Sequence, residues 1–149
     1  ERIKEMSVLY GDVNTSAESI NKLAHFGTTP FAVMMTIPQS IAFHRLLEIE
    51  KISQRLHYLK LIWVNELKDH PNVEVVTPAN KDLSCGIASF RISNKKASAV
   101  AASLYNHFNI FTVGRVLGQQ GCVRVTPGIY SSAGDIHKMV TAIKVLAAE

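Results

Sequence analysis

The chain has 149 residues, of which 47% are apolar and 19% are charged, and its mean hydropathy is +0.11. These values fit one globular domain that buries its own core, and they exclude a disordered or low-complexity chain. No apolar run reaches the roughly 18 to 20 residues of a membrane-spanning helix, so we expect no membrane association. The net charge is +4, but the basic residues are scattered along the sequence and do not alternate with aromatic residues. This argues against nucleic-acid binding.

Two features bear on the origin and compartment of the chain. The first residues lack the basic and apolar regions of a secretory signal, and Glu1 is not an initiator, so we expect a longer polypeptide. The two cysteines, Cys85 and Cys122, are too few for a disulfide scaffold and lack zinc-site spacing. This predicts a reduced, cytoplasmic setting, with Cys85 as a small buried residue. The six histidines form no ligand set, so we expect no metal.

The first third of the chain changes character near residue 26. Residues 1–26 are polar and weakly periodic. The run FGTTP at 26–30 then offers a glycine, two hydroxyl caps and a proline suited to a first helical turn. The apolar stretch 31–47 is interrupted by Pro38, which predicts two joined helices.

The remainder alternates strands with amphipathic helices. Apolar residues spaced by three or four predict a helix over 52–67, a second over 97–108 capped by Ser93 or Asn94, and a C-terminal helix opened by the capping-box pattern Ser132 to Asp135. Short β-branched or alternating runs predict strands at 73–76, 86–92, 110–113 and 122–126. The last two strands are joined by a glycine-containing segment interpreted as a flexible loop, with its glycines at Gly114, Gly118 and Gly121.

This order predicts the fold class. A helical segment followed by β-β-α-β-β-α favours an α+β two-layer sandwich. We expect a mostly antiparallel sheet with its helices on one face.

Two places offer binding chemistry. Gly27 and Thr28 precede a helix N-terminus, whose free N–H groups and partial positive charge suit a phosphate, although ordinary helix capping explains the same residues. Arg124 lies between Val123 and Val125 on a predicted strand, facing the opposite side, where a planar guanidinium suits a carboxylate. A solvated or ion-paired arginine is the alternative. Arg115 is a weaker candidate of the same kind.

Three segments together resemble one family. They are FGTTPF at 26–31, RLHYL at 55–59 and VRVTPGIYSSAGD at 123–135, in the right order and at plausible spacings. They are similar to the C-terminal part of class V aminotransferases, the pyridoxal-phosphate (PLP) enzymes of fold type I that include isopenicillin-N-epimerase-like proteins and cysteine desulfurases. The resemblance spans about residues 24–147.

The resemblance implies roles for the candidate residues. Gly27 and Thr28 would bind the PLP phosphate of the partner subunit in a cytoplasmic homodimer, and Arg124 would bind the α-carboxylate of an amino-acid substrate. Arg115 would partly replace an arginine of a substrate-binding loop. Residues 1–26 would be a lead-in from a missing large domain, and residues 27–149 the small C-terminal domain.

Two departures from the family limit what the chain does. The segment 113–118 lacks the reactive cysteine that desulfurases carry there, which disfavours desulfurase chemistry. No lysine stands in the Ser-x-His-Lys context that holds the cofactor as a Schiff base. We therefore expect the isolated chain to be inactive, with transamination, epimerisation and elimination all open for the intact enzyme. The alternative is a free-standing, non-catalytic α/β binding or interaction module.

Overall fold

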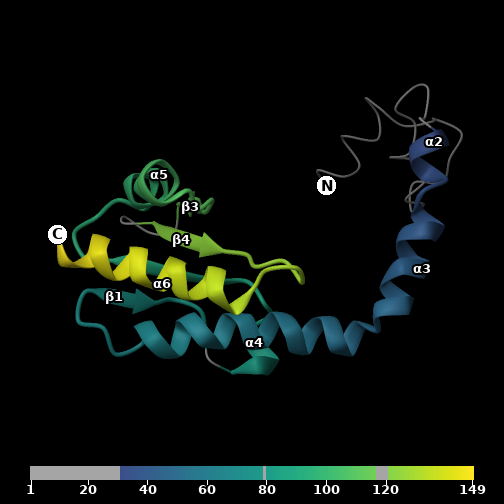
Figure 1. Ribbon diagram of the computed structural model, residues 1–149, viewed down its shortest axis with the longest axis horizontal. Helices are drawn as coiled ribbons and strands as arrows, with labels where there is room; N and C mark the ends of the chain where they lie inside the picture. The colour runs from purple at the N-terminus through teal and green to yellow at the C-terminus, as the bar shows by residue number, and fades with distance from the viewer. Residues whose placement is uncertain (1–30, 79, 117–120) are drawn as a thin grey trace, which may run out of the picture. The chain divides into compact units, whose positions relative to one another are not determined.

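The computed structural model describes residues 31–78, 80–116 and 121–149 (Figure 1). The chain divides into two compact units, residues 1–46 and residues 47–149. Gly27 and Thr28 lie outside the described residues.

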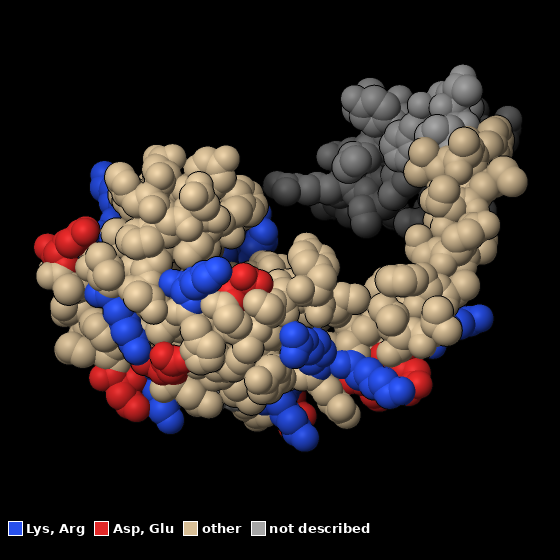
Figure 2. Space-filling model, in the orientation of Figure 1, with Lys and Arg blue, Asp and Glu red and all other residues tan. Residues whose placement is uncertain are grey.

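The described part of the first unit is helical. Helix α2 (Phe31–Met34) is followed by a turn, in which the Thr36 hydroxyl donates to the Val33 carbonyl at 2.7 Å, and by helix α3 (Ile37–Leu47). Pro38 lies in the first turn of α3, where its missing N–H costs no helical hydrogen bond. The expected pair of joined helices is therefore confirmed. Neither helix has a buried residue, and their surface in Figure 2 is almost entirely uncharged.

The second unit is built on a four-stranded antiparallel sheet in the order β1-β2-β4-β3. Its strands are β1 (Val73–Val75), β2 (Ala88–Ile92), β3 (Val113–Arg115) and β4 (Cys122–Val125). Its helices are α4 (Ile49–Leu67), the short 3₁₀ helix η2 (Lys81–Leu83), α5 (Ala97–Phe108) and α6 (Ala133–Ala148). This arrangement confirms the α+β fold class expected from the sequence.

One face of the sheet packs against the helices. Phe90 and Val123 point into a single apolar core that also contains Trp63 of α4, Leu104 of α5 and Ile143 of α6. Helices α4 and α6 lie side by side (Figure 1). The apolar residues that recur every three or four positions along α6 are all buried, as expected. In α4 the first two residues of the corresponding series, Ile52 and Leu56, are only partly buried.

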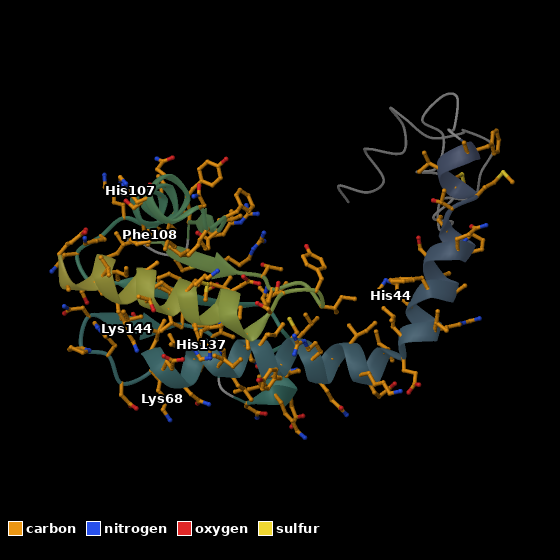
Figure 3. The ribbon with its side chains drawn as sticks, viewed as in Figure 1. His44, Lys68, His107, Phe108, His137 and Lys144 are labelled. Carbon is orange, nitrogen blue, oxygen red and sulfur yellow. The ribbon has the colours of Figure 1, made fainter. Side chains whose placement is uncertain are left out.

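Polar contacts join α4 and α6 at the surface. Glu66 of α4 accepts a hydrogen bond from Lys144 at 3.4 Å and lies 2.8 Å from the Nδ1 atom of His137. Both residues belong to α6 and are labelled in Figure 3. Because these groups are substantially exposed, they add little stability compared with the core beneath them.

The third strand begins later than the sequence predicts. Asn109 ends α5 in the left-handed conformation (φ 56°), and Ile110 still donates its N–H to the Leu104 carbonyl at 3.0 Å. The chain therefore leaves the helix over 109–112, and pairing with β4 starts at Val113. The prediction of a strand over 110–113 is wrong in this respect.

Two local expectations are also wrong: that Gly114 lies in a flexible loop, and that Ser93 or Asn94 caps α5. Gly114 belongs to β3, and a Cβ atom there would lie 3.0 Å from the carbonyl oxygen of Ala97, so this glycine permits close approach of α5 to the strand. Neither Ser93 nor Asn94 caps α5. The N-cap is Lys96, because Ile92 accepts the N–H of Lys95 in a tight turn directly after β2. Gly118 lies outside the described residues.

Cys85 is exposed, and the expectation that it is buried is wrong. The buried position is the next one. At Gly86 a Cβ atom would lie 2.5 Å from the Cβ of Leu56, so the chain passes against α4 at the glycine and turns the preceding thiol outward.

Within the described ranges, no helix is long and apolar enough to cross a membrane.

Candidate functional site

The sheet register brings Arg115 and Arg124 to one face. Arg124 pairs with Val113, and Arg115 pairs with Cys122, on neighbouring strands. Directly paired residues share a face of a sheet, and so do residues two apart on one strand. Arg115 and Arg124 are therefore diagonal neighbours on the face opposite the helices, as the sequence predicts for Arg124.

Arg124 is held without a partner on this face. The residue is partly buried, and its Nε–H group is inaccessible to solvent and donates to no acceptor among the described residues. A buried polar group that lacks a hydrogen bond is costly, and guanidinium groups pair best with planar anions. The solvated alternative does not explain this burial, and none of the ion pairs among the described residues involves Arg124.

A third arginine on this face was missed by the sequence reasoning. Arg91 lies on β2 between the core residues Phe90 and Ile92, and continuing the β2–β4 register by one pair places it opposite Cys122. Its Nε donates to the Gly121 carbonyl at 2.8 Å, and its Nη1 lies 3.3 Å from Glu74. The alternation of apolar residues over 88–92 already indicates that Arg91 faces away from Phe90 and Ile92. We call the surface defined by Arg91, Arg115 and Arg124 the arginine face.

Cys122 lies within the arginine face and outside the main core. Its side chain is buried, yet it is absent from the apolar cluster that packs against the helices. Its position on β4, facing away from the helices, accounts for both observations. A buried thiol fixed on a strand differs from a reactive cysteine on a loop.

The segment that follows Arg124 is closed by its own hydrogen bonds. The N–H of Gly128 donates to the Ser131 hydroxyl at 3.1 Å, and the N–H of Ser131 donates to the Gly128 carbonyl at 3.0 Å. Arg55 of α4 donates to the Ser131 carbonyl at 2.9 Å. Tyr130 at its tip is 91% exposed, so a large aromatic side chain is presented to solvent beside the end of β4.

The described lysines do not offer a cofactor attachment site. Lys60 is the one buried charged side chain in the described part, and its Nζ donates to the Ser84 hydroxyl at 2.8 Å. Lys138 follows His137, but it is exposed on α6. No described lysine lies on a strand, and no group of acidic, histidine or cysteine residues in the described part is arranged to hold a metal ion.

An open groove of the second unit is lined by residues of α4 and η2. It has a volume of about 640 Å³, and none of its lining residues lies on a strand. Its polar lining includes Glu50, Ser53, His57, Lys81 and Asp82. No residue that lines this groove carries a buried polar atom without a partner, whereas Arg124 does, so the candidate site is placed on the arginine face.

Solved structures share this fold. The chain aligns with a cysteine desulfurase from Thermococcus onnurineus at a TM-score of 0.74 and 20% identity, covering 85% of this chain and 34% of that one. A NifS-like protein from Rickettsia africae aligns at a TM-score of 0.74 and 15% identity, over 93% of this chain and 40% of that one. The cysteine desulfurase CsdA from Escherichia coli aligns at 0.66 and 15% identity, over 80% and 31%.

These comparisons establish the fold, which matches the C-terminal domain of NifS-like fold type I enzymes. The chain spans between three and four tenths of the length of these proteins. No protein-family model matches the sequence, and a search of curated proteins finds no match.

Proposed function

We propose that this chain is the C-terminal domain of a PLP-dependent enzyme of the class V aminotransferase type, and that it binds the α-carboxylate of an amino-acid substrate through Arg124. The observation that carries this proposal is the buried, unpartnered Nε of Arg124 on β4. The shared fold with NifS-like proteins supports it.

Arg124 suits a carboxylate for a geometric reason. The strand fixes its backbone, and neighbouring side chains shield part of the guanidinium from water, which strengthens a charge-assisted hydrogen bond. A substrate carboxylate would satisfy the group that the fold leaves unpaired. Holding the carboxylate also fixes the orientation of the substrate Cα, which is what a positioning group contributes to catalysis.

The cofactor would be held mainly by other parts of the enzyme. PLP, when bound, supplies an electron sink for a carbanion at the substrate Cα. Gly27 and Thr28 are proposed to bind its phosphate across a homodimer interface in the cytoplasm. Since no described lysine lies on a strand of the sheet that carries Arg124, the lysine that binds PLP is proposed to come from a preceding large domain, and the isolated chain is inactive.

Sulfur transfer is not the reaction we propose. By the resemblance, desulfurases carry a reactive cysteine on the segment that corresponds to residues 113–118, and the sequence has no cysteine there. Cys122 is buried in β4. Transamination, epimerisation resembling that of isopenicillin-N-epimerase-like proteins, or elimination at an amino acid fits better.

The test uses the natural protein that contains this chain. Its intact mass is expected to exceed 16.4 kDa, and it is expected to show visible absorbance from bound PLP that borohydride bleaches. Arg124→Gln should raise KM for the amino acid by roughly 30- to 1000-fold, because an unpaired carboxylate costs about 2–4 kcal/mol. Arg45→Gln, an exposed arginine on α3, is the matched control.

Two outcomes would contradict the proposal. An unchanged KM in the Arg124 variant would remove the carboxylate contact. A natural protein of 16.4 kDa without bound PLP would replace the enzyme with the non-catalytic binding module, an alternative that the shared fold does not favour.

A further inference from the structure

We propose that the substrate is an amino acid with a second carboxylate on its side chain, bound by Arg115 while Arg124 holds the α-carboxylate. This inference rests on the proposed function and adds a substrate class to it. It is carried by the diagonal placement of the two arginines and by the charge balance of the arginine face.

The placement suits a ligand with two anionic ends. Diagonal neighbours on adjacent antiparallel strands lie about 7–8 Å apart at their Cα atoms, within reach of long side chains. Arg115 and Arg124 stand in this relation through the pairs Val113 with Arg124 and Arg115 with Cys122. One short dicarboxylate can therefore contact both guanidinium groups at once.

The charge balance of the arginine face is strongly positive. The four strands carry one acidic residue, Glu74, and it is already paired with Arg91 at 3.3 Å. None of the ion pairs or hydrogen bonds in the described part involves the side chain of Arg115 or Arg124. Arg115 and Arg124 carry like charges on diagonal positions, where they repel each other less than a directly opposite pair would. An anion that binds both arginines offsets that repulsion.

The two arginines differ in burial, which assigns their roles. Arg124 is partly buried with an unpartnered Nε, whereas Arg115 is exposed near the end of the edge strand β3. The common carboxylate of every amino acid fits the fixed, shielded group. The variable side chain fits the exposed one, where a longer or shorter ligand is accommodated by rotation of the arginine.

The test titrates the ¹⁵N-labelled 149-residue chain with glutarate or with butyrate and follows the Nε–Hε resonances of its arginines by NMR. Glutarate should shift the resonances of both Arg115 and Arg124. Butyrate should shift that of Arg124 alone. Because the second contact is a charge-assisted bond, glutarate should bind about tenfold tighter than butyrate.

Variants separate this inference from the proposed function. Arg115→Gln should abolish the preference for glutarate and leave butyrate affinity unchanged, and Arg115→Lys should keep part of it. Arg45→Gln, on α3, should change neither affinity. The backbone amide spectrum reports whether each variant is folded.

The outcomes overturn different statements. Equal affinity for glutarate and butyrate in the unaltered chain, or a preference that survives Arg115→Gln, would overturn the dicarboxylate inference while the role of Arg124 stands. No response of the Arg124 resonance to either ligand would overturn both.

Discussion

Arg55 donates a hydrogen bond from Nη2 to the carbonyl oxygen of Ser131 at 2.9 Å, and so ties α4 to the segment between β4 and α6. The two residues are 76 positions apart in the sequence. The guanidinium of Arg55 also lies 5.6 Å from the ring centroid of Tyr58. This bond fixes the chain just beyond the strand that carries Arg124.

Replacing Arg55 should destabilise the second unit. Arg55→Ala removes a charge-assisted hydrogen bond to a carbonyl and a cation–π contact, and we expect a loss of about 1–3 kcal/mol in the free energy of unfolding. Urea denaturation followed by circular dichroism measures it. Arg45→Ala, at an exposed position of α3, should leave the unfolding of this unit unchanged. Equal stability of the two variants would show that the Ser131 contact contributes nothing.

Gly114 and Gly134 form a matched pair for testing the approach of α5 to β3. A Cβ at Gly114 would lie 3.0 Å from the Ala97 carbonyl oxygen and 3.1 Å from the Ser98 nitrogen, both backbone atoms. At Gly134, in the first turn of α6, the nearest contact is an ordinary 3.6 Å.

Gly114→Ala should therefore lower stability by about 1–3 kcal/mol, as overpacking does. Gly134→Ala should raise it by about 0.4–1 kcal/mol, because alanine restricts the unfolded chain and favours the helix. Thermal unfolding of both variants checks the two signs. A neutral Gly114→Ala variant would mean that α5 moves away from the strand at little cost.

The elements with strong periodicity were predictable from the sequence, and α5 and α6 show why. Their apolar residues recur every three or four positions, and the predicted bounds of α5 agree with the structure. The third strand was misplaced because the apolar residues Ile110 and Phe111 resemble a strand locally. Tertiary contacts decide otherwise, since the N–H of Ile110 bonds back to Leu104 of the helix.

The candidate site was predictable only in part. Alternation around Arg124 was enough to place it on the face opposite Val123 and Val125. Its relation to Arg115 depends on the register of β3 against β4, which no local pattern specifies. The same reason explains why the positive charge seemed scattered along the sequence, whereas the folded sheet gathers three arginines.

The apolar surface of α2 and α3 should make the isolated chain self-associate. Large apolar side chains of this unit are well exposed, among them Phe31 (72%), Met35 (72%) and Leu46 (79%). Contiguous exposed apolar surface favours association. We expect sedimentation equilibrium to show a mass above 16.4 kDa that falls on dilution.

Ile41→Gln combined with Leu46→Gln should shift that equilibrium towards the monomer. Leu83→Gln is the control, because Leu83 is also well exposed (71%) but lies on η2 in the second unit. Association that persists in the double variant would place the contact surface outside α3.

The start of α6 should make stability depend on pH. The hydroxyl of Ser132 donates to the Asp135 carboxylate at 2.7 Å, and the Ser132 N–H donates to it at 3.0 Å. These bonds, the hydroxyl bond first, lower the pKa of Asp135 below its ordinary value of 3.8. The capping box then favours the ionised carboxylate in the folded state.

The sign of the effect follows from linkage. Because the folded pKa of Asp135 is lowered, the unfolded chain binds more protons just below pH 3.8, so this contribution is complete above that pH and is lost as the pH falls through the folded pKa. Asp135→Asn should reduce the dependence of the urea midpoint on pH in this acid range, and Ser132→Ala should reduce it as well. Asp69→Asn, at an exposed position after α4, should leave the dependence unchanged. An identical acid slope in all four proteins would show that the capping box does not couple α6 to proton binding.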